Sequence, residues 1–115
     1  MKINRDLKLI ENIFEEIADI ENFTEEIDEE RFMYNKEKQK AVCLSFQNIG
    51  EYSNNISDEL KQKYSNVEWR NMKGFRNLIA HEYGKVSMGQ VWNMVKVDLP
   101  RLKSEIQKMI VDFRN

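Results

Sequence analysis

Apolar residues recur along this chain at spacings of three and four residues, the period of an amphipathic α-helix. The first stripe runs through positions 3 to 20 and consists of Ile3, Leu7, Ile10, Phe14, Ile17 and Ile20. The second runs through positions 91 to 113 and consists of Val91, Val95, Leu99, Leu102, Ile106, Met109 and Phe113. Each stripe predicts a long helix with one face in a hydrophobic core.

Residues that favour helix N-termini mark the segments between the two stripes. Thr24 or Asp28 is expected to cap a short helix that reaches about Tyr34. A central helix is expected to begin after Asn35 and to end near Ser53. Apolar residues on more than one side of this helix predict that it is well buried.

Three serines mark further helix starts. Ser57 is expected to cap a short helix that ends near residue 64. Ser65 and Ser87 are each followed three residues later by Glu or Gln, the form of a capping box, and each is expected to open a helix. Gly84 is expected to follow the C-terminal end of the helix that Ser65 opens.

Pro100 interrupts the second stripe. Because proline lacks a backbone N–H, it must kink the helix or restart it, and Asp98 is a candidate cap for the restarted half. The chain has only four glycines and one proline, too few for the many turns of an all-β fold. We therefore expect residues 1–115 to form one all-α domain, an antiparallel bundle of five to six helices.

Charge and cysteine content narrow the functional classes. The net charge of −2 excludes a polycation that coats nucleic acid, so any phosphate binding must come from a local cluster. Cys43 is the single cysteine and lies among apolar residues, which predicts a buried structural thiol and fits a reducing compartment. The start of the chain lacks the apolar core of a signal peptide, and no apolar run approaches the ~20 residues of a membrane span. A cytoplasmic protein is expected.

The side chains best suited to catalysis or ligand binding are concentrated between positions 69 and 85. This segment contains the only histidine, His81, and a cluster of basic residues. The basic residues are Arg70, Lys73, Arg76 and Lys85. Of these, Arg70, Lys73 and Lys85 are candidates for binding RNA, and no metal ligand set accompanies them.

Together these side chains suit the cleavage of RNA without a metal ion. His81 can accept or donate a proton near neutral pH, at the 2′-hydroxyl or at the leaving oxygen. Arg76 presents a planar fork that stabilises negative charge on a phosphate. Asn77 can hydrogen-bond a sugar or orient the histidine, and Tyr83 can stack on a base or be modified.

Helix geometry complicates this arrangement. Arg76 and Tyr83 are seven residues apart and share one side of a helix, whereas His81 points about 140° away from Arg76. Two alternatives follow. Either the helix ends near Ala80 and frees His81 to turn, or two chains contribute to one site in a symmetric dimer.

The sequence resembles a known family at several points. Residues 76–83 (RNLIAHEY) look like the Arg-x4-His-x-Tyr motif of HEPN ribonucleases, and more closely that of the HepT-like toxins. The resemblance extends to residues 46–51 (FQNIGE), to Trp69-Arg70, to Val91-Trp92 and to residues 98–100 (DLP). It therefore covers nearly the whole chain.

The resemblance implies an all-α bundle that dimerises with the motif in a cleft between chains. It implies a metal-independent endoribonuclease without a cofactor, in which Arg76 and His81 are catalytic and Asn77 supports them. It also implies a toxin whose partner is a nucleotidyltransferase antitoxin that adenylylates Tyr83. The alternative is a noncatalytic helical partner of such a transferase, because related proteins serve as binding modules.

Overall fold

The computed structural model describes residues 2–115, with side chains from Arg5 onward, and all regular structure in this range is helical. The elements are α1 (Lys2–Thr24), α2 (Glu29–Met33), α3 (Lys36–Asn54), α4 (Asp58–Lys63), α5 (Trp69–Glu82), the 3-10 turn η1 (Tyr83–Lys85), α6 (Met88–Asn93), the π-helical turn η2 (Met94–Asp98) and α7 (Leu99–Arg114). Because α6, η2 and α7 are continuous, the described residues form six helical segments. The predicted all-α fold is confirmed.

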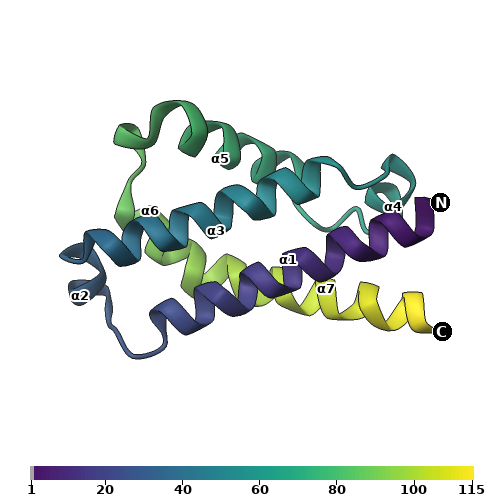
Figure 1. Cartoon of the computed structure of the whole chain (residues 1–115), viewed down its shortest axis with the longest axis horizontal. Coiled ribbons are helices and arrows are strands. Elements are labelled where there is room, and N and C mark those ends of the chain that lie inside the picture. Colours follow the sequence, from purple (N-terminus) through teal and green to yellow (C-terminus); the bar gives the residue numbers. More distant parts are fainter. Residues whose placement is uncertain (1) are drawn as a thin grey trace.

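The four long helices lie side by side in the order α5, α3, α1, α7 (Figure 1). Helix α3 contacts both α5 and α1, and α1 contacts α7. Successive helices in this row run in opposite directions, so the bundle is antiparallel as predicted. The short helices α2 and α6 close one end and α4 lies at the other. Helix α5 therefore lies at the edge of the row.

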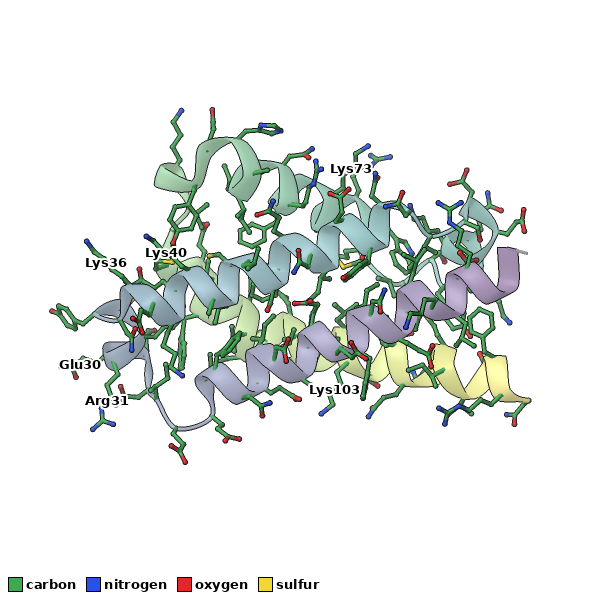
Figure 2. All side chains as sticks on the ribbon, in the orientation of Figure 1. Glu30, Arg31, Lys36, Lys40, Lys73 and Lys103 are labelled. Carbon is green, nitrogen blue, oxygen red and sulfur yellow. The ribbon has the colours of Figure 1, made fainter. Side chains whose placement is uncertain are left out.

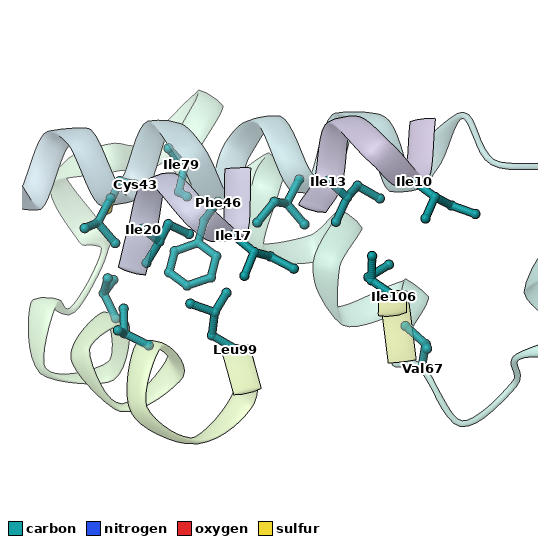
Figure 3. Packing of buried hydrophobic residues seen from close by; sticks show 14 of the residues in the cluster. Ile10, Ile13, Ile17, Ile20, Cys43, Phe46, Val67, Ile79, Leu99 and Ile106 are labelled. Carbon is teal, nitrogen blue, oxygen red and sulfur yellow. The ribbon is translucent and has the colours of Figure 1, made fainter. Parts of the chain in front are cut away.

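The core forms between α1, α3 and the segment that runs from α6 to α7 (Figure 3). On α1 the fully buried residues are Ile10, Ile13, Ile17 and Ile20. Phe14 is only partly buried, so the apolar face of α1 is centred closer to Ile13 than the predicted stripe was. Ile3, which belongs to that stripe, lies outside the residues whose side chains the structure describes.

Four of the predicted N-caps are confirmed by hydrogen bonds. The side chains of Asp28, Asn35, Ser57 and Ser87 each accept a backbone N–H from the residue three positions later, at 2.9 to 3.3 Å. Each bond satisfies a donor that the first turn of a helix leaves free. These short polar side chains therefore set where α2, α3, α4 and α6 begin.

The start of α5 differs from the prediction. Ser65 does not cap it, and the helix begins four residues later at Trp69, with no side-chain capping bond from Glu68. Tyr64 and Val67 are both buried, and the backbone N–H of Val67 donates to the carbonyl of Tyr64 at 3.1 Å. Burial of these two side chains holds residues 64–67 in a turn and overrides the local capping signal.

Two further cap predictions are wrong. Gly84 does not end α5 in a left-handed conformation, because the chain continues from α5 into η1 and none of the described residues has a positive φ. Asp98 makes no side-chain capping bond, because its backbone is helical and continues from η2 into α7.

At Pro100, where a kink or a restart of the helix was predicted, the structure has a π-helical turn directly before α7 within one continuous helical segment. Pro100 lies in the first turn of α7, directly after η2. A proline ring has no N–H and would clash with the carbonyl four residues earlier in a regular α-helix. A π-helical turn at this place accommodates it without breaking the helical segment.

Cys43 is buried as predicted, with 1% of its surface exposed. Burial raises the pKa of its thiol to about 11, so the thiol is neutral and unreactive at neutral pH. Across residues 2–115, none of the helices combines the length and the apolar character that a membrane crossing requires.

Candidate active site

The segment with the candidate chemistry forms α5 and the turn η1, and its main contact among the long helices is with α3. Ser53 Oγ lies 3.6 Å from Met72 Sδ, and the rings of Phe46 and Phe75 meet edge to face at 5.8 Å. Ile79 is the only residue of α5 that is buried within the described chain. The side of α5 that faces away from α3 is therefore open.

Gly50 of α3 lies directly against Arg76 of α5. A Cβ at Gly50 would overlap the Cβ of Arg76 and would lie 2.8 Å from the carbonyl oxygen of Met72. Only glycine permits this approach of the two helices. The backbone at Arg76 is thus placed by the packing of α5 on α3.

The guanidinium of Arg76 is held on two sides. Its Nε donates to Glu51 Oε2 at 2.7 Å, and its Nη2 lies 2.6 Å from the same oxygen. Its Nη1 donates to Asn77 Oδ1 at 2.7 Å. Two of the five N–H donors of the guanidinium are hydrogen-bonded, at Nε and Nη1, and the Nη2 group lies against the same carboxylate. Two donors remain for an anionic ligand such as a phosphate.

His81 lies on a different side of α5. The helix continues to Glu82, so His81 is helical and its side chain is exposed. The first alternative placed the end of the helix near Ala80, and α5 ends two residues later, at Glu82. Within one chain Arg76 and His81 diverge by the ~140° of a regular helix, and the structure does not bring them together.

Tyr83 shares the side of α5 that carries Arg76 and lies in η1. Its side chain is partly buried against the core. Burial raises the pKa of its hydroxyl, and the nearby Cys43 of α3 adds to the rise.

The three candidates for RNA binding are exposed. Arg70 lies on the same side of α5 as His81, whereas Lys73 lies between the sides of Arg76 and His81 and points away from the bundle (Figure 2). Lys85 Nζ lies 3.7 Å from Glu82 Oε1, an exposed pair that solvent and salt weaken. All three side chains are accessible to a ligand that binds the open side of α5.

A hollow of about 250 Å³ lies on the other flank of α5, between α3, α5 and α7. Its lining is largely apolar and includes Phe46, Ile49, Met72, Phe75 and Leu102. It contains neither Arg76 nor His81 and is separate from the candidate site. Among the described side chains, no group of three or more His, Cys, Asp or Glu residues is arranged to bind a metal ion.

Sequence reasoning missed the role of Glu51. This residue stood inside the segment 46–51 that resembles the HepT-like family, but nothing in the sequence paired it with Arg76. The two are 25 positions apart, and their contact depends on how α3 and α5 pack. Asn77 was predicted to support Arg76 and His81. In the structure its side-chain oxygen accepts a hydrogen bond from Arg76.

Comparison with known proteins identifies a family model and several relatives that match this chain. The family model described as ribonuclease HepT-like matches residues 13–109. A Thermococcus cleftensis protein named as a candidate ribonuclease HepT is 38% identical over 100 residues, which are 87% of this chain and 91% of the relative. A Methanocaldococcus jannaschii protein named as a candidate RNase is 36% identical over 104 residues, which are 90% of this chain and 95% of the relative.

No solved structure matches the chain with significance. The family match spans most of the chain, including α3, α5 and the whole of the candidate site. The family resemblance inferred from residues 76–83 is thereby confirmed. The chain belongs to the HepT-like ribonuclease family.

Proposed function

We propose that this protein is a metal-independent endoribonuclease. The observation that carries the proposal is the fixed Arg76 guanidinium, which keeps two N–H donors free on an open helix that also carries His81. Family membership supplies the reaction class, because the relatives are named as ribonucleases. RNA is the substrate in this proposal.

In the proposed reaction, the 2′-oxygen of a ribose attacks the adjacent phosphorus. A histidine either removes the proton from the 2′-hydroxyl or gives a proton to the leaving 5′-oxygen, and water serves the other of these two proton transfers. The P–O5′ bond breaks, which leaves a 2′,3′-cyclic phosphate and a 5′-hydroxyl end. Arg76 binds the nonbridging oxygens, whose negative charge grows in the transition state.

The active unit in this proposal is a symmetric dimer. Arg76 and His81 of one chain diverge, so a second copy is needed to bring a histidine to the phosphate held by Arg76. The outer sides of α3 and α5 are suited to the contact. Leu44 is 57% exposed and lies two turns before Glu51 on the same side of α3.

The biological role in this proposal is that of a cytoplasmic toxin controlled by a partner. The partner is a nucleotidyltransferase antitoxin that adds an adenylyl group to Tyr83, as the family resemblance implies. The position of Tyr83 directly after α5 supports this idea. An adenylyl group there would place a bulky anion one helical turn or less from His81 and would compete with RNA.

The test compares wild type with His81→Ala in growing cells and with purified protein. We expect growth arrest and RNA cleavage from wild type alone, and cleavage that persists in EDTA. Gln107→Ala, which changes an exposed residue on α7, is the matched control and should behave as wild type. Circular dichroism checks that each variant is folded. Equal behaviour of wild type and His81→Ala would support the noncatalytic partner instead.

A further inference from the structure

Among the side chains that the structure describes, Glu51 is the acidic one that contacts the candidate catalytic arginine. A single carboxylate oxygen accepts from Nε and lies against Nη2 of Arg76, at 2.7 and 2.6 Å. Charge-assisted bonds of this length are among the stronger hydrogen bonds in proteins. The contact links α3 to α5 at the place where Gly50 lets the helices approach.

The contact is too exposed to be important for stability. The side chains of Arg76 and Glu51 are 32% and 49% exposed, and ion pairs at such positions contribute ~1 kcal/mol or less. What the contact does determine is orientation. A free arginine side chain has many rotamers, whereas one bonded at Nε, Nη2 and Nη1 has its guanidinium plane fixed.

The orientation leaves a defined part of the guanidinium available. Glu51 occupies the Nε side and Asn77 occupies one donor of Nη1. The remaining donors belong to Nη1 and Nη2, which together form the end of the fork that binds two phosphate oxygens. Glu51 and Asn77 thus determine which edge of the guanidinium is left for a phosphate.

From this geometry we infer that Glu51 is a positioning residue that orients Arg76 toward the scissile phosphate. The inference rests on the proposed function. The carboxylate also has a cost, because its negative charge lies close to the phosphate and weakens ground-state binding. Glu51 therefore opposes RNA affinity and favours the transition state, in which the charge to be stabilised is larger.

The test is Glu51→Gln, which keeps the size of the side chain and removes its charge. We expect the single-turnover rate of RNA cleavage to fall about 10- to 100-fold, as it does when the residues that orient metal ligands are removed from metalloenzymes. RNA affinity, measured in a His81→Ala background that does not cleave, should stay the same or become tighter. A merely structural role would lower both together.

A matched control comes from a second exposed ion pair. Glu21 Oε2 lies 3.0 Å from Lys103 Nζ, between α1 and α7 and away from α5. Glu21→Gln makes the same chemical change and should leave cleavage and affinity unchanged. Glu51→Asp, with a shorter carboxylate, should recover part of the rate lost in Glu51→Gln.

A double variant separates action through Arg76 from an independent effect. In an Arg76→Ala background, Glu51→Gln should cause no further loss of rate, because the group that it orients is absent. A multiplied loss would overturn the inference, and so would a full or higher rate in Glu51→Gln. If wild type itself fails to cleave RNA, the proposed function fails, whereas cleavage by wild type and Glu51→Gln at equal rates refutes the role of Glu51 alone.

Discussion

Gly50 and Arg76 lie in direct backbone-to-side-chain contact, with no room for a methyl group between α3 and α5. The position of the candidate catalytic arginine is therefore set by a residue that has no chemistry of its own. Glu51 follows Gly50 directly. Two adjacent residues of α3 therefore contact Arg76: Gly50 leaves room for its Cβ, and Glu51 accepts a hydrogen bond from its guanidinium.

Gly50→Ala should push α5 away from α3 and displace Arg76. The new methyl group would meet the Cβ of Arg76 and the carbonyl of Met72, and neither can move without its helix. We expect a loss of about 1–3 kcal/mol in the free energy of unfolding, the usual cost of overpacking. RNA cleavage should fall at least tenfold. Urea unfolding and a cleavage assay measure the two effects.

Gly74→Ala is the matched control for this prediction. Gly74 also lies in a helix, but an added Cβ there meets nothing within 4 Å. Alanine has the higher helix propensity, so this variant should gain about 0.5–1 kcal/mol in the free energy of unfolding and leave Arg76 in place. If Gly50→Ala behaves like Gly74→Ala, the packing of α3 on α5 does not place Arg76.

Local signals in the sequence were enough to predict most of the fold. The caps at Asp28, Asn35, Ser57 and Ser87 were found because each depends on residues within one turn. The start of α5 was missed because Tyr64 and Val67 contribute more by burial than Ser65 could by capping. That burial depends on distant parts of the chain, which no local pattern contains.

The candidate site was likewise predicted from the sequence only in part. Arg76, Asn77, His81 and Tyr83 were found from one short motif. Their spacing also revealed that a regular helix separates Arg76 from His81. The contact between Arg76 and Glu51 could not be inferred, because it depends on the register of two helices. A shift of α5 by one turn would keep the same hydrophobic pattern and remove the contact.

A shared site predicts complementation between two inactive chains. Arg76→Ala and His81→Ala should each lower cleavage at least 100-fold, since each removes a group that acts in the transition state. Coexpression produces mixed dimers in which one of the two sites keeps both an intact Arg76 and an intact His81 from opposite chains. Random pairing then restores roughly a quarter of the wild-type rate.

The control for complementation is coexpression of Arg76→Ala with the double variant Arg76→Ala/His81→Ala. No dimer formed from these chains has an intact arginine, so the mixture should stay inactive. Light scattering should show dimers in every sample. Continued inactivity of the Arg76→Ala and His81→Ala mixture, with mixed dimers present, would mean that each site belongs to a single chain.

The buried thiol of Cys43 predicts a loss of stability at alkaline pH. Burial raises its pKa from 9.0 to about 11, so the folded protein holds the proton more tightly than the unfolded chain does. Stability from this group is complete below pH 9 and is lost as the pH rises to about 11. The loss is on the order of 2–3 kcal/mol.

Comparison with Cys43→Ala isolates this effect. The pKa of the Tyr64 hydroxyl is raised to about 12 and that of the Tyr83 hydroxyl is also raised, so both proteins should lose some stability above pH 10. Wild type should lose more than Cys43→Ala between pH 9 and pH 11 in urea unfolding. Parallel curves for the two proteins would show that the thiol does not titrate differently on folding.

A comparison of Tyr83 with Tyr34 tests how the proposed antitoxin chooses the tyrosine that it modifies. The choice depends either on recognition of a particular site or on the exposure of the tyrosine alone. Tyr34 is 86% exposed, whereas Tyr83 is partly buried and packs against the core. If exposure chose the target, the transferase would modify Tyr34. We expect adenylyl mass on Tyr83 instead, because it follows α5 and can be released by a local opening of η1.

The variants Tyr83→Phe and Tyr34→Phe test this choice. Coexpression of Tyr83→Phe with a cognate nucleotidyltransferase should yield an unmodified protein that stays toxic, since loss of one partly buried hydroxyl leaves Arg76 and His81 in place. Tyr34→Phe should be modified and neutralised like wild type, as judged by intact mass and by growth. Modification of Tyr83→Phe to the wild-type extent would place the target elsewhere and would leave η1 without a regulatory role.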